Sequence, residues 1–280
     1  MIIWLASYPK SGNTWVRSII SSLLYTQDGF FDFRLLKKID QFPQKKHFVD
    51  FVNDFGNLNQ IASNWISAQD RINLDGNIKL YKTHQGKYTL GNSDFTNNEN
   101  TKAVIYVVRD PRNVLSSISS HYVLTMEQSL EFMLSPKFTG NIKSFEEEKD
   151  GILTLLGKWN DHYRSWTRIK KNFLLIRYED LILDPNLELK KIISFLKKYI
   201  NFHTNDNKNN NIIKTTSFEN LRKMENEDLF KEAVLDKKTN SKVKFFNLGP
   251  KNKWEGKINK EITNSLEKNF FKEMSELKYL

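Results

Sequence analysis

The sequence predicts an α/β protein with a central, mainly parallel β-sheet flanked by helices. Two observations carry this prediction. Short apolar runs of strand length alternate with longer segments of helical periodicity, and apart from Lys79 each short run is apolar along its whole length. A strand that is covered by helices on both faces needs apolar side chains on both faces, which is the pattern of a buried parallel strand.

Four segments are expected to form the strands, and seven segments carry apolar residues at helical spacing. The strands are Ile2–Ala6, Ile78–Tyr81, Ala103–Val108 and Phe173–Ile176. The helices are Trp15–Tyr25, Asn59–Ile72, Pro111–Tyr122, Leu153–Lys171, Leu187–Tyr199, Phe218–Glu225 and Ile258–Met274. The third helix has the strongest start signal, because Asp110 stands at its N-cap and Pro111 at its first position. His203–Asn211 is a polar low-complexity run, which we expect to be an exposed loop.

Length and composition limit the class of protein. The 280 residues include no cysteine, which excludes disulfides, Cys-ligated metal sites and a thiol nucleophile. We expect a single domain over residues 1–280, because strands and helices alternate in the same way throughout. No apolar run approaches the ~20 residues of a membrane span, and no basic segment precedes the first run. A cytoplasmic protein without a stable membrane span is therefore predicted, and no metal-binding motif is present.

The net charge of +10, from 43 Lys+Arg and 33 Asp+Glu, suits several anionic partners. Nucleic acid, acidic lipid and small phosphorylated or sulfated molecules are all attracted by a basic surface. Three of the four predicted strands are followed by a cation: Lys82 after the second, Arg109 after the third and Arg177 after the fourth. Ligands of open parallel sheets bind at these carboxyl ends, so the sequence favours a small anion there. A basic face of the kind that binds nucleic acid is not evident.

The loop after the first strand has the layout of an anion-binding turn. Ser7-Tyr8-Pro9-Lys10-Ser11-Gly12-Asn13-Thr14 leads directly from strand to helix. A glycine lets backbone N–H groups point at an anion, and the helix N-terminus adds roughly half a positive charge. The ATP-type pattern G-x-x-x-x-G-K-[ST] is absent. An ordinary turn, capped by Ser11 or Asn13, remains the alternative.

The segment Tyr8–Trp15 resembles the Y-P-K-S-G-T-T-W loop of the sulfotransferases that use 3′-phosphoadenosine 5′-phosphosulfate (PAPS). Four further segments resemble motifs of that family in the same order. They are Leu80–His84 (K-[ST]-H), Val107–Ser117 (the stretch that holds the 3′-phosphate), Arg177–Leu181 (Y-E-D-[LM]) and Thr216–Leu221 (T-S-F-x-x-[LM]). The similarity spans residues 2–256, nearly the whole chain.

This resemblance implies a P-loop-containing nucleotide-binding fold and transfer of a sulfuryl group from PAPS to an acceptor hydroxyl or amine, with 3′,5′-adenosine bisphosphate (PAP) as product. It implies His84 as the general base, whose ordinary pKa near ~6.5 suits the task. Lys10 would stabilise the leaving oxygen, and Lys82 the sulfuryl oxygens. The cofactor-binding residues implied are Lys10, Ser11, Gly12, Asn13, Thr14, Trp15, Arg109, Ser117, Tyr178, Thr216, Phe218 and Gly249.

Two positions depart from the family pattern. Asn13 replaces a threonine, and the C-terminal R-K-G-x-x-G-D-W is reduced to the segment Asn247–Trp254. Gly249 and Trp254 keep their spacing, but the Arg-Lys pair is missing. Either Lys244, Lys251 or Lys253 replaces it, or cofactor affinity falls by roughly 10- to 100-fold, the usual effect of losing one charge-assisted contact.

The acceptor stays open among a sugar, a phenol, a lipid alcohol and an amine. The Phe-rich segments Gln27–Asn73 and Leu124–Asp150 are expected to shape its pocket, although most of these phenylalanines should cover the sheet. A P-loop nucleotide kinase or ATPase is the alternative function, and a non-catalytic binding module is a further one. The remaining histidines are expected to be surface or structural residues: His47, His121, His162 and His203.

Overall fold

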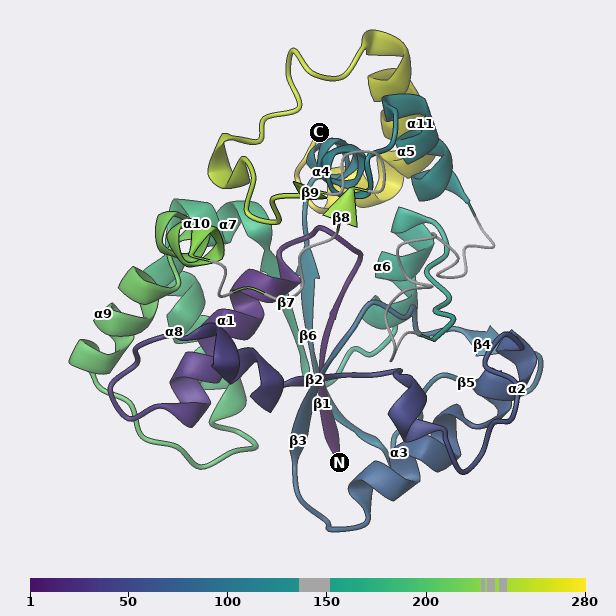
Figure 1. Cartoon of the computed structure of the whole chain (residues 1–280), viewed down its shortest axis with the longest axis vertical. Helices are drawn as coiled ribbons and strands as arrows, with labels where there is room; N and C mark the ends of the chain where they lie inside the picture. Colours follow the sequence, from purple (N-terminus) through teal and green to yellow (C-terminus); the bar gives the residue numbers. More distant parts are fainter. Residues whose placement is uncertain (136–151, 228–229, 231–234, 237–240) are drawn as a thin grey trace. The chain divides into compact units, whose positions relative to one another are not determined.

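The computed structural model describes residues 1–135, 152–227, 230, 235–236 and 241–280 (Figure 1). A five-stranded sheet has the order β2-β3-β1-β6-β7. These strands are β1 (Ile2–Ser7), β2 (Asp40–Gln41), β3 (Lys79–Thr83), β6 (Thr101–Val108) and β7 (Phe173–Arg177). β3 pairs in parallel with both β1 and β2. All four predicted strands form, and the α/β prediction is confirmed; the two-residue strand β2 was not predicted.

Two short antiparallel pairs lie outside this sheet. β4 (Thr89–Leu90) pairs with β5 (Ser93–Asp94), and β8 (Leu235–Asp236) pairs with β9 (Ser241–Lys242). The α-helices of the described residues are α1 (Asn13–Tyr25), α2 (Leu58–Ser63), α3 (Trp65–Asn73), α4 (Pro111–Tyr122), α5 (Met126–Leu134), α6 (Trp159–Thr167), α7 (Tyr178–Leu183), α8 (Pro185–Leu196), α9 (Asp206–Thr215), α10 (Phe218–Asn226) and α11 (Lys260–Glu276). Short 3₁₀ helices occur at Phe33–Lys38, Lys45–His47 and Gly249–Lys251.

One predicted helix is divided in two and another is shorter than expected, each for a local reason. The segment 59–72 breaks at Asn64, whose side-chain Nδ2 donates to the carbonyl of Gln60 at 2.9 Å and so ends α2. The segment 153–171 becomes helical only from Trp159, because Gly157 has a left-handed backbone (φ +68°) that a helix cannot contain.

The chain forms two compact units, each assembled from several segments. Unit 1 comprises Met1–Tyr8, Asp40–Tyr106 and Phe132–Leu175; unit 2 comprises Pro9–Ile39, Val107–Glu131 and Ile176–Leu280. The boundaries cross β6 and β7, and one falls after Tyr8, one residue beyond β1. The loop from Pro9 onward and the residues after β6 and β7 therefore belong to unit 2, whereas those after β3 belong to unit 1. A single domain over residues 1–280 stays a prediction.

An aromatic cluster around Trp4 forms the core of unit 1. Trp4 is fully buried, and its ring centroid lies 5.7 Å from that of Phe42, 5.4 Å from Phe95 and 6.1 Å from Trp166. Phe42 and Phe48, both from the Phe-rich segment, are also fully buried. The expectation that phenylalanines of this segment cover the sheet is thus confirmed for the residues that pack on Trp4.

A second apolar cluster lies in unit 2, beside α1. It combines Phe31 and Phe33 with Leu221, Phe230 and Phe246. α9 packs against α1, α8 and α10 in the same unit (Figure 1).

The prediction of an exposed loop over residues 203–211 is wrong from Asp206 onward, because α9 begins there. Asn205 caps this helix by accepting from the backbone N–H of Lys208 at 2.9 Å. The Lys208 side chain is buried, and its Nζ donates to the carbonyls of Leu23 at 2.8 Å and Thr26 at 2.7 Å. The last carbonyls of a helix lack intrahelical donors, and a cation is favoured there. Lys208 therefore closes the end of α1, which the polar composition of the run concealed.

We predict that Lys208→Met destabilises the protein by about 1–3 kcal/mol, because it leaves two buried carbonyls without their donor. The matched control is Lys214→Met, an exposed lysine of the same helix, for which a change within about 0.5 kcal/mol is expected. Urea unfolding of both variants measures the difference. Equal effects of the two substitutions would show that the Lys208 contacts add no stability.

Candidate active site

The loop between β1 and α1 has a backbone that few sequences adopt. Lys10 and Gly12 both have left-handed φ angles, +65° and +104°, and Gly12 is the N-cap of α1. A Cβ atom on Gly12 would stand 2.6 Å from Cδ2 of Tyr178, so only glycine fits. Left-handed residues in such a turn direct successive N–H groups into a concavity that suits an anion.

The first turn of α1 is not closed by a side chain of this loop. No side chain caps α1, so the alternative of a turn capped by Ser11 or Asn13 is wrong. Ser11 is fully buried, and its Oγ has no hydrogen-bond partner among the described residues. A buried hydroxyl without a partner costs free energy, which a bound acceptor atom would recover. The loop thus fits a phosphate or sulfate group.

Several predicted site residues of unit 2 meet around this loop. The Arg109 guanidinium lies 4.2 Å from the centroid of the Tyr178 ring, and its Nη1 donates to the Lys10 carbonyl at 3.2 Å. Its Nε is buried with no partner in the part of the chain that the structure describes. Trp15 contacts Tyr178 edge-on, with centroids 5.6 Å apart. The Lys10 Nζ lies 3.7 Å from the centroid of Phe245.

A buried network supports the ends of β6 and β7. Glu179 accepts from the backbone N–H of Asp110 at 3.0 Å and from the Tyr279 hydroxyl at 2.9 Å. Burial raises the pKa of Glu179, while these two bonds and the nearby Arg109 favour its charged form. Arg112 bridges Asp110 and Glu267, each at 2.7 Å. The network orders the backbone on either side of Arg109 and Tyr178.

The C-terminal stretch is docked on α4 by Asn252. Its Oδ1 accepts from Ser116 Oγ at 2.8 Å and from Lys257 Nζ at 3.0 Å, and its Nδ2 donates to the Asn113 carbonyl at 3.2 Å. Lys244, Lys251 and Lys253 are exposed. Sequence reasoning missed Asn252 and Lys257; they lie within and just after the degraded motif, which was the available signal. Ser117 is half-buried on the same helix.

Two further predicted residues have mainly structural surroundings. Gly249 has φ +51°, and a Cβ there would stand 2.2 Å from the Phe218 ring, so this ring occupies the space beside the glycine. Thr216 is buried and donates to the Ile212 carbonyl at 2.8 Å, which ends α9. Asn13 and Thr14 are buried in the first turn of α1.

In unit 1, Lys82 lies in β3 and His84 directly follows this strand. Lys82 is only 8% exposed, and His84 is half-buried. Nδ1 of His84 lies 2.9 Å from the Ser7 carbonyl oxygen and 3.3 Å from Ser7 Oγ. A carbonyl oxygen can only accept, so Nδ1 carries the hydrogen and Nε2 of the neutral ring keeps its lone pair. In the neutral ring Nε2 is thus the nitrogen that can act as a base, as set by the backbone of β1.

Two other histidines are buried in unit 1. Burial lowers the pKa of His162 to about 3, and burial lowers the pKa of His47 to about 4. His162 bonds through Nδ1 to the Tyr106 hydroxyl at 2.8 Å and through Nε2 to the His84 carbonyl at 3.0 Å. His162 is therefore a buried residue that contacts the backbone of His84. The sequence shows only a single histidine on a predicted helix and did not indicate this contact.

Comparison with known proteins identifies the family. The sulfotransferase domain model matches residues 2–278. The chain belongs to the sulfotransferase family. It is 28% identical to human (Homo sapiens) Sulfotransferase 2A1, covering 83% of this chain and 72% of that protein. It is also 28% identical to Sulfotransferase 1B1 of Canis lupus familiaris, covering 79% of this chain and 66% of the relative.

Solved structures share the fold. Mouse sulfotransferase SULT7A1, complexed with PAP, matches 97% of this chain and 84% of its own, with a TM-score of 0.61 and 21% identity. Retinol dehydratase, in a complex with retinol and PAP, matches 98% of this chain and 81% of its own, with a TM-score of 0.55 and 17% identity. The predicted fold class is thereby confirmed. The chain spans between 59% and 72% of the lengths of four curated relatives that it matches.

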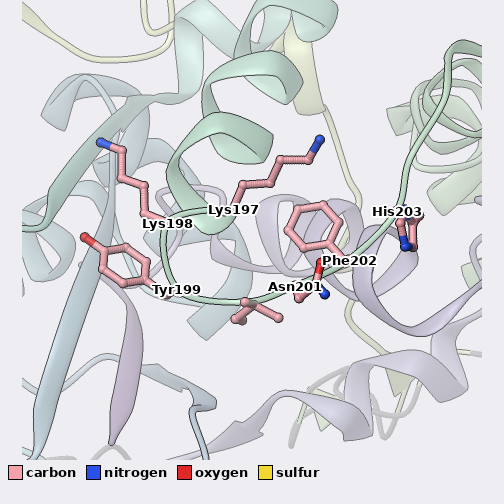
Figure 2. A pocket seen from close by; sticks show the side chains of 7 residues that line it. Lys197, Lys198, Tyr199, Asn201, Phe202 and His203 are labelled. Atoms are coloured by element: carbon pink, nitrogen blue, oxygen red, sulfur yellow. The ribbon is translucent and has the colours of Figure 1, made fainter.

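A surface pocket of this protein is lined by none of the predicted catalytic or cofactor-binding residues. Its volume is about 530 Å³, and one continuous segment, Lys197 to His203, lines it. Figure 2 shows Lys197 and Lys198 extending away from each other. The segment follows the C-terminus of α8, whose partial negative charge disfavours an anion.

None of the described residues forms a cluster of three or more potential metal ligands, and none of the described helices is long and apolar enough to cross a membrane. Residues 136–150 of the predicted acceptor segment lie outside the described residues.

Because burial lowers the pKa of His162 and His47, we predict that the free energy of unfolding falls in acid. An unfolded histidine has its ordinary pKa of 6.5, so below that pH the unfolded chain binds protons that His162 and His47 do not bind until about pH 3 and 4. Their contribution is complete above pH 6.5 and is lost as the pH falls through this window, by about 2 kcal/mol per histidine at about pH 5.

Urea unfolding at about pH 7 and about pH 5 measures this loss. His47→Gln, which cannot titrate, should show a smaller loss between the two pH values than the wild-type protein. An unchanged pH dependence in this variant would contradict the assignment of His47.

Proposed function

We propose that this protein transfers the sulfuryl group of PAPS to a hydroxyl or amine of a small-molecule or carbohydrate acceptor. One observation carries the proposal. Two buried donors, Ser11 Oγ and Arg109 Nε, lack partners among the described residues, beside a left-handed loop that opens α1. The chemistry of these donors fits phosphate oxygens, and a nucleotide with phosphates at both ends would engage both.

The solved relatives support the choice of nucleotide, because SULT7A1 and retinol dehydratase were solved with PAP. PAPS, when bound, supplies the sulfuryl group and leaves as PAP. Lys10, Ser11, Gly12, Asn13 and Thr14 would hold its 5′ side through the loop N–H groups and their own donors.

The 3′-phosphate would be held by Arg109 and Ser117. Trp15, Tyr178, Thr216, Phe218 and Gly249 would surround the adenine. Lys257 is a further candidate to replace the missing Arg-Lys pair, because it is held beside α4 through Asn252.

The residues of unit 1 would handle the proton. Nε2 of His84 accepts the proton from the acceptor hydroxyl or amine, while Nδ1–H stays bonded to the Ser7 carbonyl. Lys82 stabilises negative charge on the sulfuryl oxygens, and Lys10 that on the leaving oxygen. Hydroxysteroid sulfotransferases of Cavia porcellus are among the relatives, which supports an apolar alcohol as acceptor. A cytoplasmic location stays a prediction.

We predict that PAP stabilises the protein more than AMP does, because only PAP carries the 3′-phosphate that Arg109 would bind. A ligand at ~100 times its Kd adds about 2.7 kcal/mol. Thermal shifts with PAP, AMP and Mg²⁺–ATP measure the difference. Arg109→Met should reduce the PAP shift to that of AMP, whereas Arg34→Met, an exposed arginine of the same unit, should leave it unchanged. Equal shifts with PAP and AMP in the wild type would refute the role of Arg109, and a shift with Mg²⁺–ATP alone would favour the kinase alternative.

We predict that His84→Gln lowers sulfuryl transfer by at least about 100-fold, because it removes the only group assigned to take the proton. The Kd for PAP should change by less than about twofold, since His84 is assigned no nucleotide contact. Transfer is measured with ³⁵S-labelled PAPS and a panel of hydroxylated acceptors. His203→Gln is the control and should retain activity. Turnover that survives in His84→Gln would remove this histidine as the base.

A further inference from the structure

The backbone that follows β3 is held by side chains of one face of α6. Nε2 of His162 lies 3.0 Å from the His84 carbonyl oxygen, and Trp166 Nε1 donates to the Gln85 carbonyl at 3.0 Å. Ser165 Oγ accepts from the backbone N–H of Lys87 at 2.9 Å. Residues at positions i, i+3 and i+4 share a helix face, so three neighbouring side chains bind three nearby peptide groups.

The direction of each hydrogen bond follows from the chemistry of its partners. The His84 carbonyl can only accept, so His162 carries its hydrogen on Nε2. Nδ1 then accepts from the Tyr106 hydroxyl at 2.8 Å. Burial raises the pKa of Tyr106 well above its ordinary value and lowers that of His162, so the phenol stays protonated and the imidazole neutral. A chain of oriented bonds runs from Tyr106 through His162 to the carbonyl of His84.

The same residue, His84, takes part in a second oriented bond, from its ring Nδ1 to the Ser7 carbonyl. Its backbone is therefore fixed from α6 and its ring from β1, both within unit 1. A rotation of the peptide after His84 would lengthen the bond to His162, and a shift of the His84 Cα would lengthen both bonds. Gln85 restrains the next peptide as well: it is fully buried, and its Oε1 accepts from the Leu155 N–H at 2.7 Å.

We propose that His162, with its tautomer fixed by Tyr106, is a positioning residue for His84 and keeps the lone pair of the base on Nε2. This proposal rests on the proposed function, in which His84 is the general base. Positioning matters because a displacement of about 1 Å costs on the order of 100-fold in rate. His162 touches neither the acceptor nor the nucleotide in this assignment, so its effect passes through the His84 backbone.

Two substitutions of His162 separate positioning from packing. Nε2 of a glutamine can occupy the place of the histidine Nε2, so His162→Gln keeps the donor to His84, whereas His162→Leu keeps the volume and removes it. We expect His162→Leu to lower kcat by about 10- to 100-fold and to leave the Kd for PAP within about twofold. His162→Gln should recover most of the kcat. Tyr106→Phe provides an independent variant, should His162→Leu not fold, and should lower kcat in the same way.

The ring of His84 gives a readout that needs no turnover. The ¹⁵N chemical shifts of His84 should show hydrogen on Nδ1 alone in the wild type and in His162→Gln. In His162→Leu and Tyr106→Phe the hydrogen should be shared between Nδ1 and Nε2. If the wild type shows this tautomer but transfers no sulfuryl group, the proposed function fails and the positioning of His84 still stands.

The matched control is Thr96→Val, which removes another buried hydrogen bond of unit 1, from Thr96 Oγ1 to Gln69 Oε1. It should lower the Tm and leave kcat and the His84 tautomer unchanged. If His162→Leu and Tyr106→Phe lower only the Tm, in the manner of Thr96→Val, the proposal is overturned and both side chains serve stability alone.

Discussion

The hydrogen bond between the His84 ring and the Ser7 carbonyl is the contact on which the chemistry assigned to unit 1 depends. It joins the ends of two adjacent parallel strands, β1 and β3, whose register places Ala6 beside Thr83. Because the acceptor is a backbone carbonyl, Nδ1 of His84 carries the hydrogen for as long as the ring stays within reach of Ser7. The bond therefore sets which nitrogen of His84 acts as a base, provided that the ring is held in this place.

Unit 2 depends on a different constraint, the close approach of Tyr178 to Gly12. A side chain on residue 12 would displace this ring, and the ring is also the surface on which Arg109 stacks and against which Trp15 packs. Tyr178 thus ties the first loop to the end of β6. The network of Glu179, Asp110 and Tyr279 holds the backbone of both strand ends in turn. Three motifs that lie far apart in the sequence meet because one aromatic ring contacts all of them.

The sequence indicates these features unevenly, for physical reasons. β1 and β6 were predictable because strands buried on both faces are continuously apolar, and β3 and β7 because their short apolar runs are followed by cations. Lys10, Arg109 and Tyr178 were predictable because they follow such strands. β2 was not, since two residues are too few for a pattern. α9 was missed because its stability comes from Lys208 and Ile212, which pack on α1 and the segment after it, rather than from helix propensity. His162 was expected to be no more than a surface or structural residue, although a polar pair, His162 and Ser165, on an otherwise aromatic helix face is a signal of buried hydrogen bonds.

In the degraded C-terminal motif the spacing of Gly249 and Trp254 is kept, although the Arg-Lys pair of the family pattern is missing. Gly249 and Trp254 keep their places because both are packing positions. Gly249 lies beside Phe218, and the Arg112 guanidinium lies over the Trp254 ring, with its Cζ 4.3 Å from the ring centroid. Asn252, bonded to Ser116 and to the Asn113 carbonyl, anchors the segment to α4 without any charge. Once the backbone is anchored by a neutral side chain, a cation can come from another position, and Lys257 reaches this same asparagine from five residues further along the chain.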